Sequence, residues 1–165
     1  MKIVFHGSYI EVKKPDLTFS RANLDFGKGF YVTTDHEQAT RLARRWLRRG
    51  HKAIFNSYIY SDELIEELNL KFKGFPFYDN EWLHFVADNR KGIANNDYDI
   101  ICGGIANDKV FNTLELFFDG LIPESEALDR LKFEKPNSQI CIRKQHLIES
   151  LLHFDSSEEV IYGGE

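Results

Sequence analysis

The chain has 165 residues, 42% hydrophobic and 28% charged, and its 21 basic and 26 acidic side chains give a formal net charge of −5. This length and composition predict a single domain over residues 1–165, and they exclude a collagen, a coiled coil and a disordered chain. The acidic balance argues against tight, non-specific nucleic-acid binding by the whole domain. No apolar run approaches the ~18 residues of a spanning helix, so we expect no membrane partner.

The first third of the chain predicts two short strands, over residues 2–6 and 29–33, joined by an irregular connection over 7–28. Because side chains alternate across a strand, an apolar pair is expected to be buried on one face of each strand. These pairs are Ile3 with Phe5 and Phe30 with Val32.

The clearest helix is predicted over residues 35–49. Thr34 and Glu37 have the spacing of a capping box, and Gly50 stands where a C-terminal glycine belongs. One face is apolar and is expected to be buried, and it consists of Ala39, Leu42, Ala43, Trp46 and Leu47. The opposite face carries five arginines, which are Arg41, Arg44, Arg45, Arg48 and Arg49.

The arginine face has two interpretations. It is either a solvated helix surface or a docking surface for an acidic partner or a phosphate backbone. We favour the solvated surface, because the chain as a whole is acidic and no aromatic residue is expected among the exposed positions for base stacking.

The remaining elements alternate between strands and helices without a regular βαβ repeat, so the expected fold class is α+β. They are a strand 52–60, a helix 62–68, a helix after Asp79, a strand 98–102, a helix after Asn107, a helix after Pro123, a strand 138–142, a helix 144–151 and a strand 159–162. Asp79 and Asn107 are expected N-caps, and Pro123 suits a first helical turn. The helix after Asn107 is expected to bury its apolar side chains, Phe111 among them, and to end at Gly120.

The sequence contains none of the common metal-binding or nucleotide-binding motifs. The six histidines include no pair at metal-ligand spacing on a helix and there is no Cys-x-x-Cys, so no metal is expected. A P-loop and a Gly-x-Ser-x-Gly elbow are absent, and Gly27-Lys28-Gly29 precedes a strand, whereas a Rossmann turn follows one. Cys102 and Cys141 lie in apolar runs and are expected to be reduced core thiols of a cytoplasmic protein.

The strongest signal is a set of three strands, each of which is expected to direct one polar or aromatic side chain away from its buried face. His6 follows the first apolar pair, Tyr31 lies within the second, and Gln139 accompanies Ile140 and Ile142 in the strand 138–142. A single histidine or tyrosine in a strand is usually structural. The three together, with glycines beside the first two, indicate a binding site.

Two motifs resemble the catalytic core of ADP-ribosyltransferases. They are His6-Gly7-Ser8 and Asp25-Phe26-Gly27-Lys28-Gly29-Phe30-Tyr31, the second followed by Asp35 and Ala39 on a helix. The match is to the histidine–tyrosine–glutamate branch, which includes diphtheria toxin and the poly-ADP-ribose polymerases. The whole chain is also similar to an uncharacterised bacterial family placed in that superfamily, including Glu81-Trp82-Leu83-His84-Phe85-Val86, Asn89-Arg90 and the Ala106-Asn107-Asp108 turn.

The resemblance implies a split β-sheet core with surrounding helices and NAD as the substrate. By this resemblance His6 would bond the adenosine-side ribose, the Gly7 backbone would bind the nicotinamide amide and Tyr31 would stack on the nicotinamide ring. The implied catalytic residues are His6, Tyr31 and Gln139, and the implied NAD-binding residues are His6, Gly7, Ser8, Gly27, Gly29, Phe30, Tyr31 and Gln139.

The chain departs from this branch in two places. Gln139 stands where the branch has a glutamate, and an amide can bond a ribose hydroxyl but carries no charge and cannot act as a base. The polymerases carry a second stacking tyrosine on the helix after the Gly-Tyr strand. Here the nearest aromatic residue is Trp46, which is expected in the core.

The expected function is therefore mono-ADP-ribosylation of a protein or nucleic-acid acceptor, by a bacterial toxin-like or modifying enzyme with a cognate antitoxin among its expected partners. One alternative is a catalytically silent protein that binds NAD or an ADP-ribose-like ligand. Another is an NAD glycohydrolase that uses water as the acceptor. Gln139 is the feature that separates the transferase from the silent binder.

Overall fold

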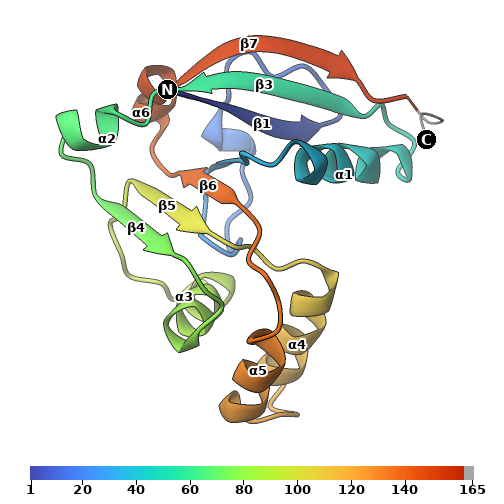
Figure 1. Cartoon of the computed structure of the whole chain (residues 1–165), viewed down its shortest axis with the longest axis vertical. Helices are drawn as coiled ribbons and strands as arrows, with labels where there is room; N and C mark the ends of the chain where they lie inside the picture. Colours follow the sequence, from blue (N-terminus) through green and yellow to red (C-terminus); the bar gives the residue numbers. More distant parts are fainter. Residues whose placement is uncertain (162–165) are drawn as a thin grey trace.

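The computed structural model describes residues 1–161 and has an α+β architecture, with two β-sheets and six α-helices in that range. Figure 1 shows the sheets one above the other, with α4 and α5 projecting beyond the lower sheet. The three-stranded sheet has the order β1-β3-β7 and the four-stranded sheet the order β2-β6-β5-β4. The strands are β1 (Lys2–Ser8), β2 (Phe30–Val32), β3 (Ile54–Tyr60), β4 (Phe72–Phe75), β5 (Ile100–Gly103), β6 (Gln139–Ile142) and β7 (Leu152–Glu159).

Backbone pairing joins the two sheets at one corner. The strand pairs are antiparallel except for β4 and β5, which are parallel and are connected through α3. An isolated bridge links Phe5 of β1 to Thr33, directly after β2, through two N–H···O bonds of 2.8 and 2.9 Å. The two sheets diverge from this bridge.

Three of the six α-helices in the described range begin at a side-chain cap, α1, α3 and α4. The helices are α1 (His36–Leu47), α2 (Leu64–Glu67), α3 (Asn80–Arg90), α4 (Asp108–Phe118), α5 (Glu124–Leu131) and α6 (Gln145–Leu151). The Asp79 carboxylate accepts from the Trp82 N–H at 2.9 Å and the side-chain Oδ1 of Asn107 accepts from the Val110 N–H at 2.9 Å, so both expected N-caps are confirmed. Pro123 is the N-cap of α5, one residue before the first helical position at which it was expected.

The expected cap of α1 is wrong by one residue. Asp35, and not Thr34, caps the helix, because the Asp35 carboxylate accepts from the Gln38 N–H at 3.1 Å. The Thr34 hydroxyl instead hydrogen-bonds the Ser138 hydroxyl at 2.7 Å. Thr34 therefore ties the start of α1 to the start of β6.

Two hydrophobic cores lie on opposite faces of the four-stranded sheet. The first fills the space between the sheets and includes Val4, Phe30, Tyr58, Ile140 and Ile142. The second lies on the other face, beneath α3, α4 and α5, and includes Phe26, Trp82, Leu83, Ile101 and Cys141. The four-stranded sheet is thus covered on both faces.

The predicted faces of β1 are reversed in the structure. Val4 is fully buried in the first core, whereas Ile3 is 58% exposed. His6 shares the inward face with Val4, and its ring centroid lies 4.4 Å from that of Phe30. The expectation that His6 points away from the core is therefore wrong, because β1 packs against the second sheet through the face that bears Val4.

Further differences concern two strands and two aromatic side chains. The sequence pattern does not predict β4, and it places the last strand at 159–162, whereas β7 ends at Glu159 and Tyr162 lies outside the described residues. Phe111 is 43% exposed although it was expected in the core of its helix. Trp46, also expected in the core, is only partly buried.

Both cysteines are free, with Cys141 buried and Cys102 partly buried, as expected. Burial raises the pKa of each thiol to about 12, so neither is a thiolate at neutral pH. Within residues 1–161, no helix combines the length and the apolar character needed to cross a membrane.

Candidate functional site

A cleft of about 1030 Å³ opens where the two sheets diverge. One wall comes from the three-stranded sheet and the segment that follows it, with Lys2, Tyr60 and Asp62. The other wall comes from β4, β5 and the residues leading into β6, and it includes Phe72, Phe75, Gly103, Asn137 and Gln139. The volume is at the upper end of the range for small-molecule sites, so the cleft can accept a ligand of dinucleotide size.

Gln139 and Tyr60 both line this cleft with a buried side-chain polar atom that has no hydrogen-bond partner among the described residues. Gln139 opens β6 opposite Gly103 of β5 and is only 2% exposed. Its side-chain Nε2 has no hydrogen-bond partner among the described residues. Leaving a buried donor unsatisfied typically costs about 1–3 kcal/mol, so this amide favours a ligand that brings an acceptor to it.

The imidazole of His6 does not line the cleft. It lies between the sheets, where Nδ1 is 2.8 Å from the backbone carbonyl oxygen of Tyr31. Burial lowers the pKa of His6, and the bond to the Tyr31 carbonyl only partly opposes this effect. The imidazole is therefore held neutral with Nδ1–H as donor, and it links β1 to β2.

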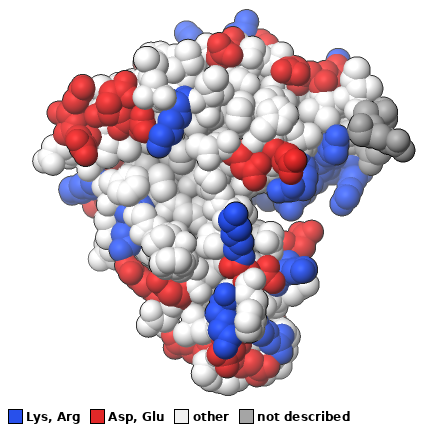
Figure 2. Space-filling view, in the orientation of Figure 1, with Lys and Arg blue, Asp and Glu red and all other residues white. Residues whose placement is uncertain are grey.

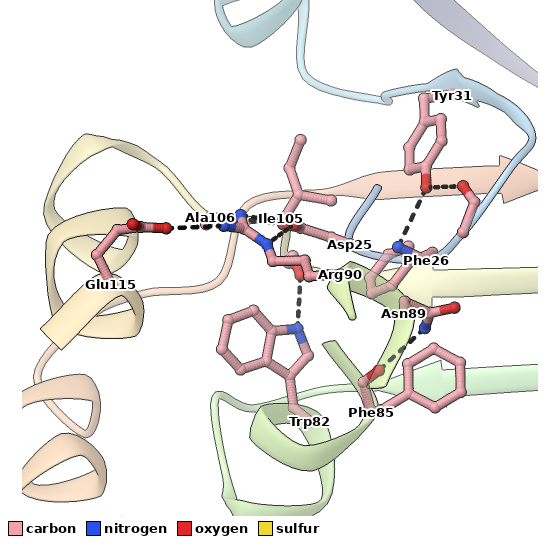
Figure 3. Close-up of polar contacts among 12 residues, drawn as sticks. Asp25, Phe26, Tyr31, Trp82, Phe85, Asn89, Arg90, Ile105, Ala106 and Glu115 are labelled. Atoms are coloured by element: carbon pink, nitrogen blue, oxygen red, sulfur yellow. Dashed lines mark hydrogen bonds and ion pairs between the residues drawn. The ribbon is translucent and has the colours of Figure 1, made fainter. Parts of the chain in front are cut away.

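The side chain of Tyr31 lies on the other face of β2, in the second core. Its hydroxyl donates to the Gly27 carbonyl at 2.6 Å and accepts from the Phe26 N–H at 3.1 Å (Figure 3). Its ring stacks on Phe26, with 6.3 Å between the centroids. Burial raises the pKa of Tyr31 well above its ordinary value. Tyr31 thus fixes the loop before β2, and Phe26 lies beside its ring.

The other residues of the two motifs are also used in packing. A Cβ on Gly7 would lie 2.4 Å from the Ala39 carbonyl oxygen, so this glycine allows α1 to pack directly on β1. Gly27 has a φ of +79°, in the left-handed region that favours glycine. Ser8 and Phe30 are both buried.

Gly29 packs equally closely on β6, because a Cβ there would lie 2.4 Å from the Cys141 sulfur. Of the eight predicted site residues, therefore, only Gln139 lines the cleft. His6 and Tyr31 hold together the strands that frame it.

A loop that was not among the predicted site residues follows directly after Gly103 of the cleft wall. After Gly103, the backbone of residues 104–106 is held by side chains from three directions. The indole N–H of Trp82 donates to the Gly104 carbonyl at 2.7 Å. The Tyr78 hydroxyl donates to the Ile105 carbonyl at 3.0 Å.

Asn137 completes this support through a double hydrogen bond. Its side-chain oxygen accepts from the Ile105 N–H at 2.8 Å, and its amide donates to the Ile105 carbonyl at 3.0 Å. These two hydrogen bonds connect the loop to the segment just before Gln139. In the sequence, the only indication that Asn137 belongs to the site was its position two residues before Gln139.

The motif residues Asp25 and Arg90 meet behind this loop, as Figure 3 shows. The Arg90 guanidinium donates through Nε to Asp25 Oδ1 at 2.7 Å. Its Nη2 lies 2.7 Å from the same oxygen. Asp25 Oδ2 accepts from the Ala106 N–H at 2.8 Å. The Arg90 guanidinium also lies 5.0 Å from the ring centroid of Phe111. Asp25 therefore connects the loop before β2, α3 and the loop after β5.

The rim of the cleft on the side of α2 is acidic. Asp62 is paired with the Lys2 ammonium and with the amino terminus, each at 3.0 Å. The hydrogen bond from Lys2, followed by that from the amino terminus, lowers the pKa of Asp62 to about 2. Lys2 is the one basic side chain among the described residues that line the cleft, and it is already paired with Asp62. Among residues 1–161, no cluster of three or more His, Cys, Asp or Glu side chains is placed to hold a metal ion.

The fold and the site together define an α+β protein with a large cleft between two sheets, one buried amide in its wall and a hydrogen-bonded loop behind it. The chain belongs to the family described as Protein of unknown function (DUF3990), whose model matches residues 1–154. Comparison with curated proteins and with solved structures finds no match.

Proposed function

We propose that the protein is an NAD-dependent mono-ADP-ribosyltransferase that modifies a macromolecular acceptor, with its substrate in the cleft between the two sheets. The observation that carries this proposal is the unpartnered Nε2 of Gln139, in the wall of a 1030 Å³ cleft. Gln139 is the residue that the resemblance to ADP-ribosyltransferases assigns to the ribose of NAD.

The cleft suits the parts of NAD. Phe72, which is 46% exposed, offers an aromatic face to the nicotinamide or the adenine ring. The Gln139 amide can donate to a ribose hydroxyl. The divergence of the sheets from the Phe5–Thr33 bridge supports the finer assignment of a split ADP-ribosyltransferase-like core.

In the proposed reaction the glycosidic bond between the ribose C1′ and the nicotinamide nitrogen breaks, and nicotinamide leaves with the bonding electron pair. A nucleophilic atom of the acceptor forms the new bond to C1′, and its proton passes to solvent. Gln139 positions the ribose but cannot remove that proton. The cleft therefore favours one transfer per acceptor site and does not favour chain elongation.

His6 and Tyr31 have roles that differ from the NAD contacts implied by the resemblance. Both act as positioning residues, because His6 bonds the Tyr31 backbone and the Tyr31 hydroxyl bonds the loop at Gly27. We therefore expect NAD affinity to depend directly on Gln139 and Phe72, and on His6 and Tyr31 only through the folded frame.

Replacing Gln139 by methionine separates a ligand role from a structural one. Methionine fills a similar volume without a polar group, so Gln139→Met removes an unsatisfied buried donor and is expected to keep or raise the urea midpoint of unfolding. The same variant is expected to lose NAD binding by at least about tenfold, as followed by calorimetry. Phe72→Leu, which removes an aromatic face, is the second binding variant.

Turnover is measured with NAD labelled on the adenine side, incubated with a bacterial lysate and then treated with protease or nuclease. Label that one of these treatments releases identifies the class of acceptor. Gln139→Glu is expected to raise the rate of nicotinamide release, because a negative charge stabilises the oxocarbenium-like transition state. A wild-type protein that binds no NAD contradicts the proposal.

A silent NAD-binding protein is the second candidate, and the neutral amide at position 139 favours it. In that case wild type binds NAD without releasing nicotinamide, and Gln139→Glu gains turnover. Release of nicotinamide by wild type without any labelled macromolecule would instead identify an NAD glycohydrolase.

A further inference from the structure

The C-terminal end of α1 carries an exposed cluster of three aromatic side chains, Tyr9, Trp46 and His51. The ring centroids of Tyr9 and Trp46 lie 4.6 Å apart, and that of His51 lies 5.2 Å from Tyr9 and 5.8 Å from Trp46. Tyr9 is 41% exposed, His51 is exposed and Trp46 is partly buried. The exposed positions of α1 carry no Phe, Tyr or Trp, as expected, and the exposed rings of this cluster come from neighbouring segments of the chain.

The turn after α1 brings these rings together. Gly50 has a φ of +78°, its N–H donates to the Leu47 carbonyl at 3.1 Å, and the His51 N–H donates to the Trp46 carbonyl at 3.0 Å. These two bonds are those of a Schellman motif, which reverses the chain after a helix. Because of this reversal, His51 lies against Trp46, and Tyr9, directly after β1, packs on both.

Two of the arginines lie beside the cluster. The helical spacing places Arg45 and Arg49 one turn apart on the side of Trp46, whereas Arg44 and Arg48 lie on the opposite side of α1. All five arginines of the 41–49 segment are exposed, and Figure 2 shows Lys and Arg side chains gathered along the part of the molecule where α1 lies. Of the five, only Arg41 and Arg45 form ion pairs with residues in the range 1–161, at 3.8 and 3.6 Å and with exposed carboxylates. The Arg49 guanidinium lies 5.1 Å from the Trp46 ring centroid.

We propose that this aromatic–arginine surface, formed by Tyr9, Trp46, His51, Arg45 and Arg49, binds single-stranded nucleic acid. Unpaired bases have accessible faces that stack on aromatic rings, and guanidiniums bind the phosphates between them. An acidic protein would complement the arginines but not the rings, and a duplex hides its base faces. The combination of exposed rings and arginines therefore favours a single strand.

The surface lies on α1, away from the residues that form the cleft between the sheets. Binding of single-stranded nucleic acid does not depend on the proposed transfer reaction and is measured without NAD. A negative result in this binding experiment is therefore distinct from a negative result for the proposed function. Local charge explains how a chain with a net charge of −5 attracts a polyanion here.

The test is fluorescence anisotropy with labelled single strands of about 20 nucleotides, one of DNA and one of RNA, which cover several of the ~4–16-nucleotide sites typical of such surfaces. The double variant Arg45→Glu, Arg49→Glu is expected to weaken binding at least about tenfold and to flatten its salt dependence. Tyr9→Leu is expected to weaken binding about tenfold, whereas Tyr9→Phe keeps the ring and is expected to bind like wild type.

A matched control carries the same change of charge elsewhere. The double variant Lys132→Glu, Lys135→Glu removes two exposed cations after α5 and is expected to leave binding close to that of wild type. Equal weakening by both double variants, no binding of either nucleic acid by wild type, or unchanged binding by Tyr9→Leu would each overturn the proposal. The ratio between the DNA and RNA affinities identifies the type of strand.

Discussion

At the scale of single residues, His6 is a buried titratable side chain, and its surroundings disfavour the protonated, charged imidazole. Burial lowers its pKa in the folded protein, while the unfolded chain has an ordinary histidine pKa of about 6.5. As the pH falls below about 6.5, the unfolded chain binds the proton first, so the free energy of unfolding decreases until the pH reaches the lowered native pKa. Above about 6.5 this contribution is constant. Urea unfolding at several pH values between about 5 and 8 measures it.

Two variants assign this pH dependence. His6→Gln is expected to flatten the slope between about pH 5 and 6.5, and His146→Gln, on an exposed histidine, is expected to keep it. Asp62, Asp97 and Asp99 have pKa values lowered in the folded state, chiefly by hydrogen bonds from lysines, against burial at Asp99. Their contribution is lost only below about pH 4. A slope that survives in His6→Gln would contradict the assignment to His6.

At the scale of the elements, the start of α1 depends on one carboxylate. Asp35→Ala removes the acceptor of the Gln38 N–H and is expected to lower the free energy of unfolding by about 1 kcal/mol. Thr34→Ala, the neighbouring change, leaves that cap intact and is expected to cost less. Chemical denaturation of the two variants measures the difference, and equal losses would show that Asp35 is not the dominant cap.

The sequence predicts the helices of this fold better than its strands. Amphipathic spacing and capping residues are local, so Asp79, Asn107 and Pro123 locate the starts of three helices correctly. A strand depends on a partner elsewhere in the chain. β4 has four residues and is stabilised by pairing with β5, and β7 is rich in Asp, Ser and Glu but pairs along the whole of β3. Intrinsic propensity cannot report either pairing.

At the scale of the whole molecule, the first core makes the two sheets depend on each other. It takes side chains from the three-stranded sheet, the four-stranded sheet and α6. We expect one cooperative transition, with equal calorimetric and van't Hoff enthalpies. Fluorescence separates the two regions, because the chain has two tryptophans, with Trp82 in the second core and Trp46 on α1. Trp46→Phe and Trp82→Phe are each expected to give coincident fluorescence and circular-dichroism transitions, and separate transitions in either variant would contradict this.

The candidate site was predictable only in part. The motifs identified the strands that frame the cleft and selected Gln139, but alternation alone could not tell which face of β1 would be covered. His6 and Tyr31 carry polar atoms that suit a site, but in the structure these atoms are hydrogen-bonded to the protein backbone. His6 bonds the backbone of β2, and the Tyr31 hydroxyl bonds the loop before β2. Asn137 and Tyr78 were missed because their partner, the backbone of Ile105, comes from a distant segment.

The central position of β6 also has a consequence for synthesis of the protein. β6 is the strand with which both β2 and β5 pair, yet it is made after both of them, and β7 and α6 follow it. A nascent chain that has emerged from the ribosome only as far as α5 has its early strands without the partner that joins them. Completion of the four-stranded sheet, and with it the wall that holds Gln139, must wait until nearly the whole domain has been translated. Such non-local pairing also slows folding. The cleft is therefore assembled only after β6 has been made, when the other strands that enclose it are already present.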